Sequence, residues 1–190
     1  TISYLPHFIS NVVVAGLAMM VLSTDGGLIN SLIVRFGGEP IHFLGSPEHF
    51  RSILVISHVW QTVGWGSILY LAAMSGIDPG LYEAAKIDGA GRFRQAWHIT
   101  LPGISPVIAI MLVLSIGGLL NAGFEQVLLL YSPAVYEVAD IIDTYVYREG
   151  LTSLNYSFAT AVGLFKNVLA MLLILGANYA AKRMNQTGIW

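Results

Sequence analysis

Residues 83–102 have the sequence EAAKIDGAGRFRQAWHITLP and separate two long apolar runs of the chain. Ala84 and Ala85 favour a helix, whereas Asp88 followed by Gly89 is a helix-breaking pair. Gly89 also permits a tight turn, because glycine tolerates positive φ. A second helical pattern follows, with apolar residues three and four positions apart. The stretch therefore predicts two short helices joined by a turn, lying outside a bilayer between two membrane spans.

The composition is that of a membrane protein. Of the 190 residues, 55% are hydrophobic and only 11% are charged, whereas about 25% of the residues in a soluble domain are charged. The formal net charge of -2 argues against a nucleic-acid partner. The chain has no cysteine, which excludes disulfides and thiolate metal sites from it.

The stretch at 83–102 resembles the EAA loop of bacterial ABC importer permeases. Its fixed identities are Glu-Ala-Ala, a glycine after three further residues, and Ile-x-Leu-Pro after nine more. The resemblance covers nearly all of the chain and is greatest to permeases for oligosaccharides and polysaccharides, related to the maltose permease subunits. It implies that the loop docks on an ATPase subunit. The residues that it assigns to this coupling are Glu83, Ala84, Ala85, Asp88, Gly89, Ile99, Leu101 and Pro102.

The resemblance implies an all-α membrane protein with the helical bundle of a type I ABC importer permease. Residues 1–190 are expected to form one permease domain, with further helices preceding it, and residues 77–101 its cytoplasmic coupling loop. Four spans are predicted, because about 20 apolar residues cross a bilayer: residues 5–22, 52–76, 103–120 and 156–181. Residues 28–36 predict a short amphipathic helix on the membrane surface, and residues 185–190 a short tail.

Basic residues indicate the orientation. Five lie in the loop at 77–101 and near the C-terminus, and three lie in the other two loops. The positive-inside rule then places the EAA loop and the C-terminus in the cytoplasm of a bacterial cell. The outer loops are net acidic, which gives no support for a uronate-rich or phosphorylated sugar as the solute.

No catalytic pattern is present in the sequence. It has no Walker A, His-Glu-x-x-His or Gly-x-Ser-x-Gly motif, so we expect a non-catalytic subunit without a cofactor or metal. The resemblance implies a second permease subunit, two ATPase subunits and an external solute-binding protein as partners, in contact with membrane lipid. The implied function is import of an oligosaccharide or polysaccharide fragment.

Two other functions are weighed against an importer permease. An ion-gradient-driven secondary transporter usually has an acid inside a span, and no Asp or Glu lies inside the four predicted spans. For an integral membrane enzyme the sequence offers no catalytic constellation.

A candidate solute path follows the third span. Asn121, Phe124, Glu125 and Gln126 occupy about one helical turn there, and an aromatic ring beside amides suits a sugar. The alternative is a helix end with ordinary capping. In the second span, His58 and Gln61 are candidates to face a water-filled path.

Three other polar residues have two possible roles each. Asn11 in the first span is expected to form an interhelical hydrogen bond rather than to bind solute. Glu83 either pairs with a basic residue of the ATPase subunit or stabilises a helix dipole. Lys166 must lie within the fourth span, because the apolar run after it is too short to cross alone. We expect it to point into the bundle or toward the second permease subunit; the alternative is a snorkelling lysine with local contacts.

Overall fold

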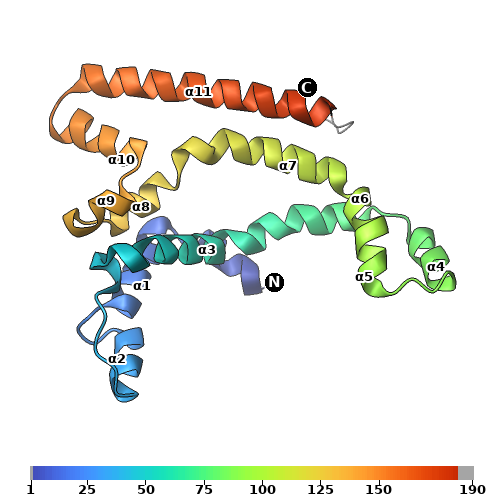
Figure 1. The fold of residues 1–190 in the computed structure, drawn as a ribbon, viewed down its shortest axis with the longest axis horizontal. Coiled ribbons are helices and arrows are strands. Elements are labelled where there is room, and N and C mark those ends of the chain that lie inside the picture. The colour runs from blue at the N-terminus through green and yellow to red at the C-terminus, as the bar shows by residue number, and fades with distance from the viewer. Residues whose placement is uncertain (1, 184–190) are drawn as a thin grey trace. The chain divides into compact units, whose positions relative to one another are not determined.

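The computed structural model describes residues 2–183, and in that range all regular structure is helical (Figure 1). The chain forms two compact units, residues 1–64 with 121–164 and residues 65–120 with 165–190. The helices, in chain order, are η1 (Ile2–Phe8), α1 (Asn11–Leu22), α2 (Leu28–Arg35), η2 (Phe43–Gly45), α3 (Pro47–Ser75), α4 (Pro79–Ile87), α5 (Arg92–Gln95), η3 (Ala96–Thr100), α6 (Leu101–Gly103), α7 (Ser105–Gly118), η4 (Leu119–Asn121), α8 (Phe124–Leu130), η5 (Pro133–Val135), α9 (Tyr136–Ala139), α10 (Ile142–Tyr147), η6 (Arg148–Thr152) and α11 (Tyr156–Arg183).

The first predicted span, residues 5–22, is not one straight helix. It is divided into η1 and α1, which are bent by 108° relative to each other at a short break. Ser10 lies at the break with extended backbone, and its Oγ accepts a hydrogen bond from the Val13 amide at 3.4 Å. Ser10 thus acts as the N-cap of a new helix, which explains why an unbroken apolar run does not give an unbroken helix.

The core of the first unit surrounds Phe50, which is completely buried and clusters with Ala15, Leu130, Val135 and Ala139. The predicted short helix at 28–36 is confirmed as α2. Its buried Asn30 donates to the carbonyls of Ser23 and Ile41, both at 2.9 Å, and accepts from the Ile41 amide. These bonds tie the loops on either side of α2 together. The position of α2 on a membrane surface stays a prediction.

A second polar cluster of this unit joins Asp140 to Arg148. The guanidinium contacts the carboxylate at 2.6 Å and lies 4.8 Å from the centroid of the Tyr136 ring. The hydrogen bond from Arg148 holds the pKa of Asp140 below its usual range; partial burial opposes this shift and a hydrogen bond from Thr144 adds to it. The pair fixes the chain after α9 to the end of α10.

Fewer helices than predicted meet the length and composition of a membrane span. Among the described residues two do, Ser105–Leu130 and Tyr156–Arg183, and the bent pair η1–α1 is a third if it counts as one broken span. Helix α3 covers the second predicted span but does not qualify, because polar residues such as His58 and Gln61 lower its hydropathy.

The third predicted span continues past residue 120. After α7 and η4 the backbone turns through the left-handed region at Ala122 and Gly123, with φ of 43° and 67°, and helix resumes as α8. The apolar segment therefore ends at Leu130 and contains Glu125. This segment is a candidate span by length and composition and extends beyond the predicted one at 103–120. The expectation that no acid lies inside a span stays a prediction.

The fourth predicted span is confirmed as α11, a helix of 28 residues. In the second unit, Gly117 of α7 lies close to α11, since a Cβ there would be 3.0 Å from Ile174 Cδ1. Lys166 lies within α11 and is half-buried, so its place inside the helix is as predicted. The group that its ammonium faces stays a prediction. The predicted tail at 185–190 lies outside the described residues.

Candidate functional site

Residues 77–101, the predicted coupling loop, are called the coupling segment below. This segment begins with a capped helix. The Asp78 carboxylate accepts a hydrogen bond from the Gly80 amide at 2.9 Å, and Pro79 occupies the first turn of α4. Both features are typical of a helix start, where backbone amides have no partner within the helix. Asp78 therefore fixes the point at which the chain leaves α3 and enters the coupling segment.

Helix α4 ends in a Schellman motif centred on Gly89. The Ala90 amide donates to the Ala85 carbonyl at 2.8 Å, and the Gly89 amide donates to the Lys86 carbonyl at 3.0 Å. Gly89 has φ of +73°, the left-handed conformation that this motif requires and that glycine adopts without strain. The predicted turn at Gly89 is confirmed, and the motif explains the fixed spacing between the alanines and the glycine.

The second helix of the segment is tied back to the first. Tyr82 of α4 and Thr100 share a hydrogen bond between hydroxyls at 2.9 Å, and Gln95 Nε2 donates to the Ala90 carbonyl at 2.7 Å. Residues 96–100 form a π-helical turn before Pro102. Proline has no N–H to donate and clashes with the carbonyl four residues before it, which favours a departure from α-helix at this place. The two predicted short helices are confirmed, and Figure 1 shows them beside the loop that joins them.

The coupling segment exposes large apolar side chains. Ile87 is 87% exposed, Phe93 84% and Trp97 62%. Single exposed apolar residues are common on protein surfaces, whereas a group of them on one short segment indicates an interaction surface. Among the predicted coupling residues, Glu83 and Asp88 are exposed and Ala85 is half-buried.

The remaining predicted coupling residues lie on both helices. Ala84 precedes the turn on α4, Ile99 lies on η3, and Leu101 and Pro102 lie on α6. Glu83 is the fifth residue of α4 and lies beyond its first turn. A helix dipole acts on charges within the first turn, so the helix-dipole role for Glu83 is wrong.

A second candidate site is a pocket in the first unit, with a volume of about 530 Å³. All four predicted solute-path residues line it. Three segments form its walls: the break between η1 and α1, the middle of α3, and the turn that leads into α8. The lining residues are His7, Ile9, Ser10, Asn11, His58, Gln61, Thr62, Asn121, Gly123, Phe124, Glu125 and Gln126.

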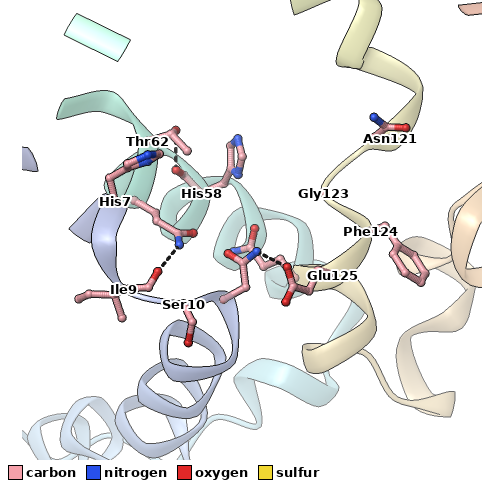
Figure 2. A pocket seen from close by; sticks show the side chains of 12 residues that line it. His7, Ile9, Ser10, His58, Thr62, Asn121, Gly123, Phe124 and Glu125 are labelled. Atoms are coloured by element: carbon pink, nitrogen blue, oxygen red, sulfur yellow. Dashed lines mark hydrogen bonds between the residues drawn. The ribbon is translucent and has the colours of Figure 1, made fainter. Parts of the chain in front are cut away.

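Glu125 is the only carboxylate among the lining residues, all of which belong to the described part of the chain. Asn11 Nδ2 donates to Glu125 Oε2 at 2.6 Å, which links α1 to α8. The interhelical hydrogen bond predicted for Asn11 is confirmed. Figure 2 shows this bond, with His58 and Asn121 reaching into the space above it. The pocket thus offers imidazole, amide and carboxylate groups to a polar ligand.

The four predicted residues differ in what they present to the pocket. Asn121 and Glu125 are exposed. The Phe124 ring packs toward Tyr147, with the ring centroids 6.1 Å apart, and points away from His58 in Figure 2. Gln126 is 5% exposed, and its Nε2 donates to Ser57 Oγ at 2.6 Å. Gln126 therefore serves packing between α8 and α3 more than ligand contact.

Sequence reasoning placed His58 and Gln61 in a water-filled path, and both line the pocket. It missed His7, Ser10 and Thr62. The first two belong to the helix break, and the available signal was Ser10, a preferred N-cap residue within an apolar run. No group of His, Asp and Glu among the described residues could hold a metal ion.

Comparisons with known proteins identify the family of the chain. The family model described as "Binding-protein-dependent transport system inner membrane component" matches residues 1–186. The chain is similar to the polygalacturonan/rhamnogalacturonan transport system permease protein YteP of Bacillus subtilis strain 168, with 51% identity over all of the chain and 59% of the relative. It is also similar to Protein LplB of the same organism, with 49% identity over all of the chain and 60% of the relative.

A solved structure has the same fold. The crystal structure of a bacterial alginate ABC transporter in complex with an alginate pentasaccharide-bound periplasmic protein contains a chain that superimposes with a TM-score of 0.96 and 47% identity. The match covers all of this chain and 66% of that one. The chain thus spans about 60% of the length of these curated relatives. With the family model matching nearly every residue, the chain belongs to the inner membrane components of binding-protein-dependent transport systems.

Proposed function

We propose that this chain is part of a permease subunit of an ATP-driven importer in a bacterial inner membrane. The observation that carries the proposal is the coupling segment. Its α4 helix ends at a left-handed Gly89, and its exposed side chains include Ile87 and Phe93. Such a segment presents exposed apolar side chains, among exposed charged ones, to a soluble partner. The proposed partner is an ATPase subunit in the cytoplasm. Two candidate spans follow the segment, so the proposed side of the C-terminus is the cytoplasm as well.

The importer that we propose contains two permease subunits, two ATPase subunits and an external solute-binding protein. ATP hydrolysis is assigned in this proposal to the ATPase subunits, which is supported by the lack of a Walker A motif in residues 1–190. The proposal of a binding protein is supported by the solved relative, which is a complex with a periplasmic protein. The hypothesis for Glu83 is an ion pair with a basic residue of the ATPase subunit.

We propose that the solute is an oligosaccharide fragment of an acidic polysaccharide. One relative is named for polygalacturonan and rhamnogalacturonan, and the solved relative for alginate. These names favour an acidic sugar, for which the sequence alone gave no support. The pocket suits the hydroxyl groups of such a solute, because hydroxyl groups require both donors and acceptors, whereas the Glu125 carboxylate does not favour the acid groups of the solute. Asn121, His58 and Glu125 offer both.

An ion-gradient-driven transporter is the competing function. Glu125 inside the apolar segment Ser105–Leu130 is the kind of residue that it would need. Glu125 instead accepts a short hydrogen bond from Asn11, and the family to which the chain belongs is named for binding-protein-dependent transport. The family match favours the importer, whereas the hydrogen bond of Glu125 is compatible with either function.

The test uses the full-length permease, reconstituted in lipid vesicles with its ATPase subunits and its solute-binding protein. Uptake of labelled oligogalacturonides and of labelled neutral oligosaccharides is measured with and without ATP, and with ionophores that collapse ion gradients. We expect ATP-dependent uptake that ionophores do not abolish. Uptake that persists without ATP and stops with ionophores would favour the secondary transporter.

Two variants test the pocket in the same vesicles. We expect Asn121→Ala to weaken uptake, because its amide is exposed to the pocket, and Phe124→Ala to act indirectly through Tyr147. Unchanged uptake by both variants, for every solute that the system carries, would remove the pocket from the solute path and leave the coupling segment unaffected.

A further inference from the structure

A stripe of three residues on one face of α3, namely Ser57, Gln61 and Gly64, contacts both of the other pocket segments. These residues have i, i+4 and i+7 spacing, which places them one above another on a helix. Gln61 is 8% exposed and Gly64 is buried. The stripe is therefore an internal surface, and each of its members makes a different contact.

Gln61 donates a hydrogen bond to the Ile9 carbonyl. The helix break leaves this carbonyl without the backbone amide that would bond to it in a continuous helix. In a continuous helix the Ile9 carbonyl would accept from the Val13 amide. That amide instead bonds to the capping Ser10 side chain, and Gln61 Nε2 donates to the Ile9 carbonyl at 2.9 Å. The Ile9 carbonyl is partly buried, and leaving it without a hydrogen bond is unfavourable, so Gln61 stabilises the bent form of η1–α1 over a straight one.

Gly64 provides the space that the bent form needs. A Cβ at this position would collide with the backbone carbonyl of Ser3 in η1. Two residues further along, a Cβ at Gly66 would meet nothing within 4 Å among the described residues. The close approach of η1 to α3 thus depends on one glycine of the pair and not on the other.

Ser57 links the same stripe to α8. Its hydroxyl is 2.6 Å from the Ile53 carbonyl, to which it donates, and it accepts from Gln126 Nε2 at 2.6 Å. The residue before Gln126 is Glu125, which accepts from Asn11 at the start of α1. Three hydrogen bonds therefore connect the segments in a ring. Gln61 joins α3 to the helix break, Asn11 joins α1 to α8, and Gln126 joins α8 back to α3.

We propose that Gln61 is a positioning residue for the pocket. Its bond to Ile9 fixes the bend, the bend places Asn11 opposite α8, and Asn11 holds the Glu125 carboxylate at the pocket wall. Loss of the Gln61 amide favours a straighter η1–α1, which moves Asn11 away from Glu125 and lets the carboxylate turn out of the pocket. The inference rests on the proposed function, in which this pocket lies on the solute path.

The test uses a thiol reporter in the assembled full-length importer in vesicles. This chain has no cysteine, so Asn121→Cys adds the only thiol of residues 1–190. Its labelling rate is compared for a cationic and an anionic methanethiosulfonate reagent. After division by the ratio of the two rates with a free thiol in solution, we expect the cationic reagent to be favoured about twofold to fivefold, because the Glu125 carboxylate lies in the same pocket. Glu125→Gln should remove this preference.

The deciding variant is Gln61→Met, which keeps the side-chain length and loses the donor. We expect Gln61→Met to lower the preference for the cationic reagent toward the value found in Glu125→Gln. In a protein that already carries Asn11→Ala, adding Gln61→Met should not change the preference further. Gly64→Ala should act like Gln61→Met, and Gly66→Ala should leave the preference unchanged. If Gln61→Met does not assemble, Gly64→Ala carries the test.

Three outcomes would overturn the inference. The first is that Gln61→Met or Gly64→Ala keeps the parental preference for the cationic reagent while Glu125→Gln loses it. The proposed solute pocket would then remain, but Gln61 would have no positioning role in it. The second is an equal loss in Gly66→Ala, which indicates general destabilisation. The third is a reporter at Asn121→Cys that neither reagent labels, which would also remove the pocket from a water-filled path and so contradict the proposed solute path.

Discussion

The Ala90 amide donates to the Ala85 carbonyl at 2.8 Å across a left-handed Gly89. This bond closes α4 and sets the direction in which the chain leaves it. Because the second alanine of the EAA motif supplies the carbonyl and the glycine supplies the conformation, the motif is first of all a structural requirement. The exposed side chains around it then provide the contact surface.

Gly89→Leu should separate ATP hydrolysis from uptake. A Cβ at Gly89 would meet no atom within 4 Å, so the cost comes from φ of +73° and not from a collision. Holding leucine in this conformation costs about 1–2 kcal/mol, which favours a different turn. We expect Gly89→Asn to keep most of the coupling, because asparagine tolerates the left-handed region. Full uptake by Gly89→Leu at the parental ATP cost would contradict the structural role of the turn.

Phe93→Ala should weaken the attachment of the ATPase subunits. Phe93 is 84% exposed on the coupling segment, and Phe36 is 87% exposed after α2 in the other unit. Phe36→Ala is therefore a matched control that removes an equally exposed ring. We expect a loss of copurified ATPase for Phe93→Ala alone. Equal retention in the two variants would show that Phe93 lies outside the contact surface.

Asp140→Asn should lower stability at neutral pH and not at acid pH. Arg148 depresses the pKa of Asp140, so the ion pair stabilises the fold above the unfolded-state pKa of about 3.9. That stability is lost as the pH falls through the depressed folded-state pKa. We expect a loss of about 0.5–1 kcal/mol near pH 7, because the pair is partly exposed. Thermal unfolding in detergent from pH 3 to pH 8 measures it; a pH-independent difference would contradict the ion-pair account.

Lys166→Leu should assemble poorly with the second permease subunit or lose control of gating. Lysine inside a span costs about 2.5–3.5 kcal/mol when it faces lipid, so we expect its ammonium to face protein. Lys182→Leu near the end of α11 is the control, because a lysine there reaches the membrane interface. Normal assembly and uptake by Lys166→Leu would support the snorkelling alternative instead.

Local sequence signals predicted the coupling segment well. The Schellman motif depends on residues 85–90, and the N-cap on Asp78 and Gly80, so adjacent residues contain the necessary information. The helical form of residues 156–183 follows in the same way from a long apolar run.

The helix break at Ile9 and Ser10 could not be predicted in this way. In our proposal it depends on Gln61 and Gly64, which lie more than fifty residues away. It also depends on whether the Val13 amide donates to the Ser10 hydroxyl or to the Ile9 carbonyl. The sequence indicated that Asn11 would form an interhelical bond but not that Glu125 would accept it. Both contacts join segments that lie far apart in the chain.

Cross-linking decides whether the segment around Gly89 contacts an ATPase subunit. Ile87 is 87% exposed beside the turn, and Ile87→Cys adds the only thiol of residues 1–190. A photoactivatable thiol reagent is attached there and at Phe36→Cys in the assembled importer. We predict a covalent adduct with the ATPase subunit from position 87, with a yield that changes on adding ATP, and none from position 36. Adducts of equal yield from both positions, or none from position 87, would contradict the claim.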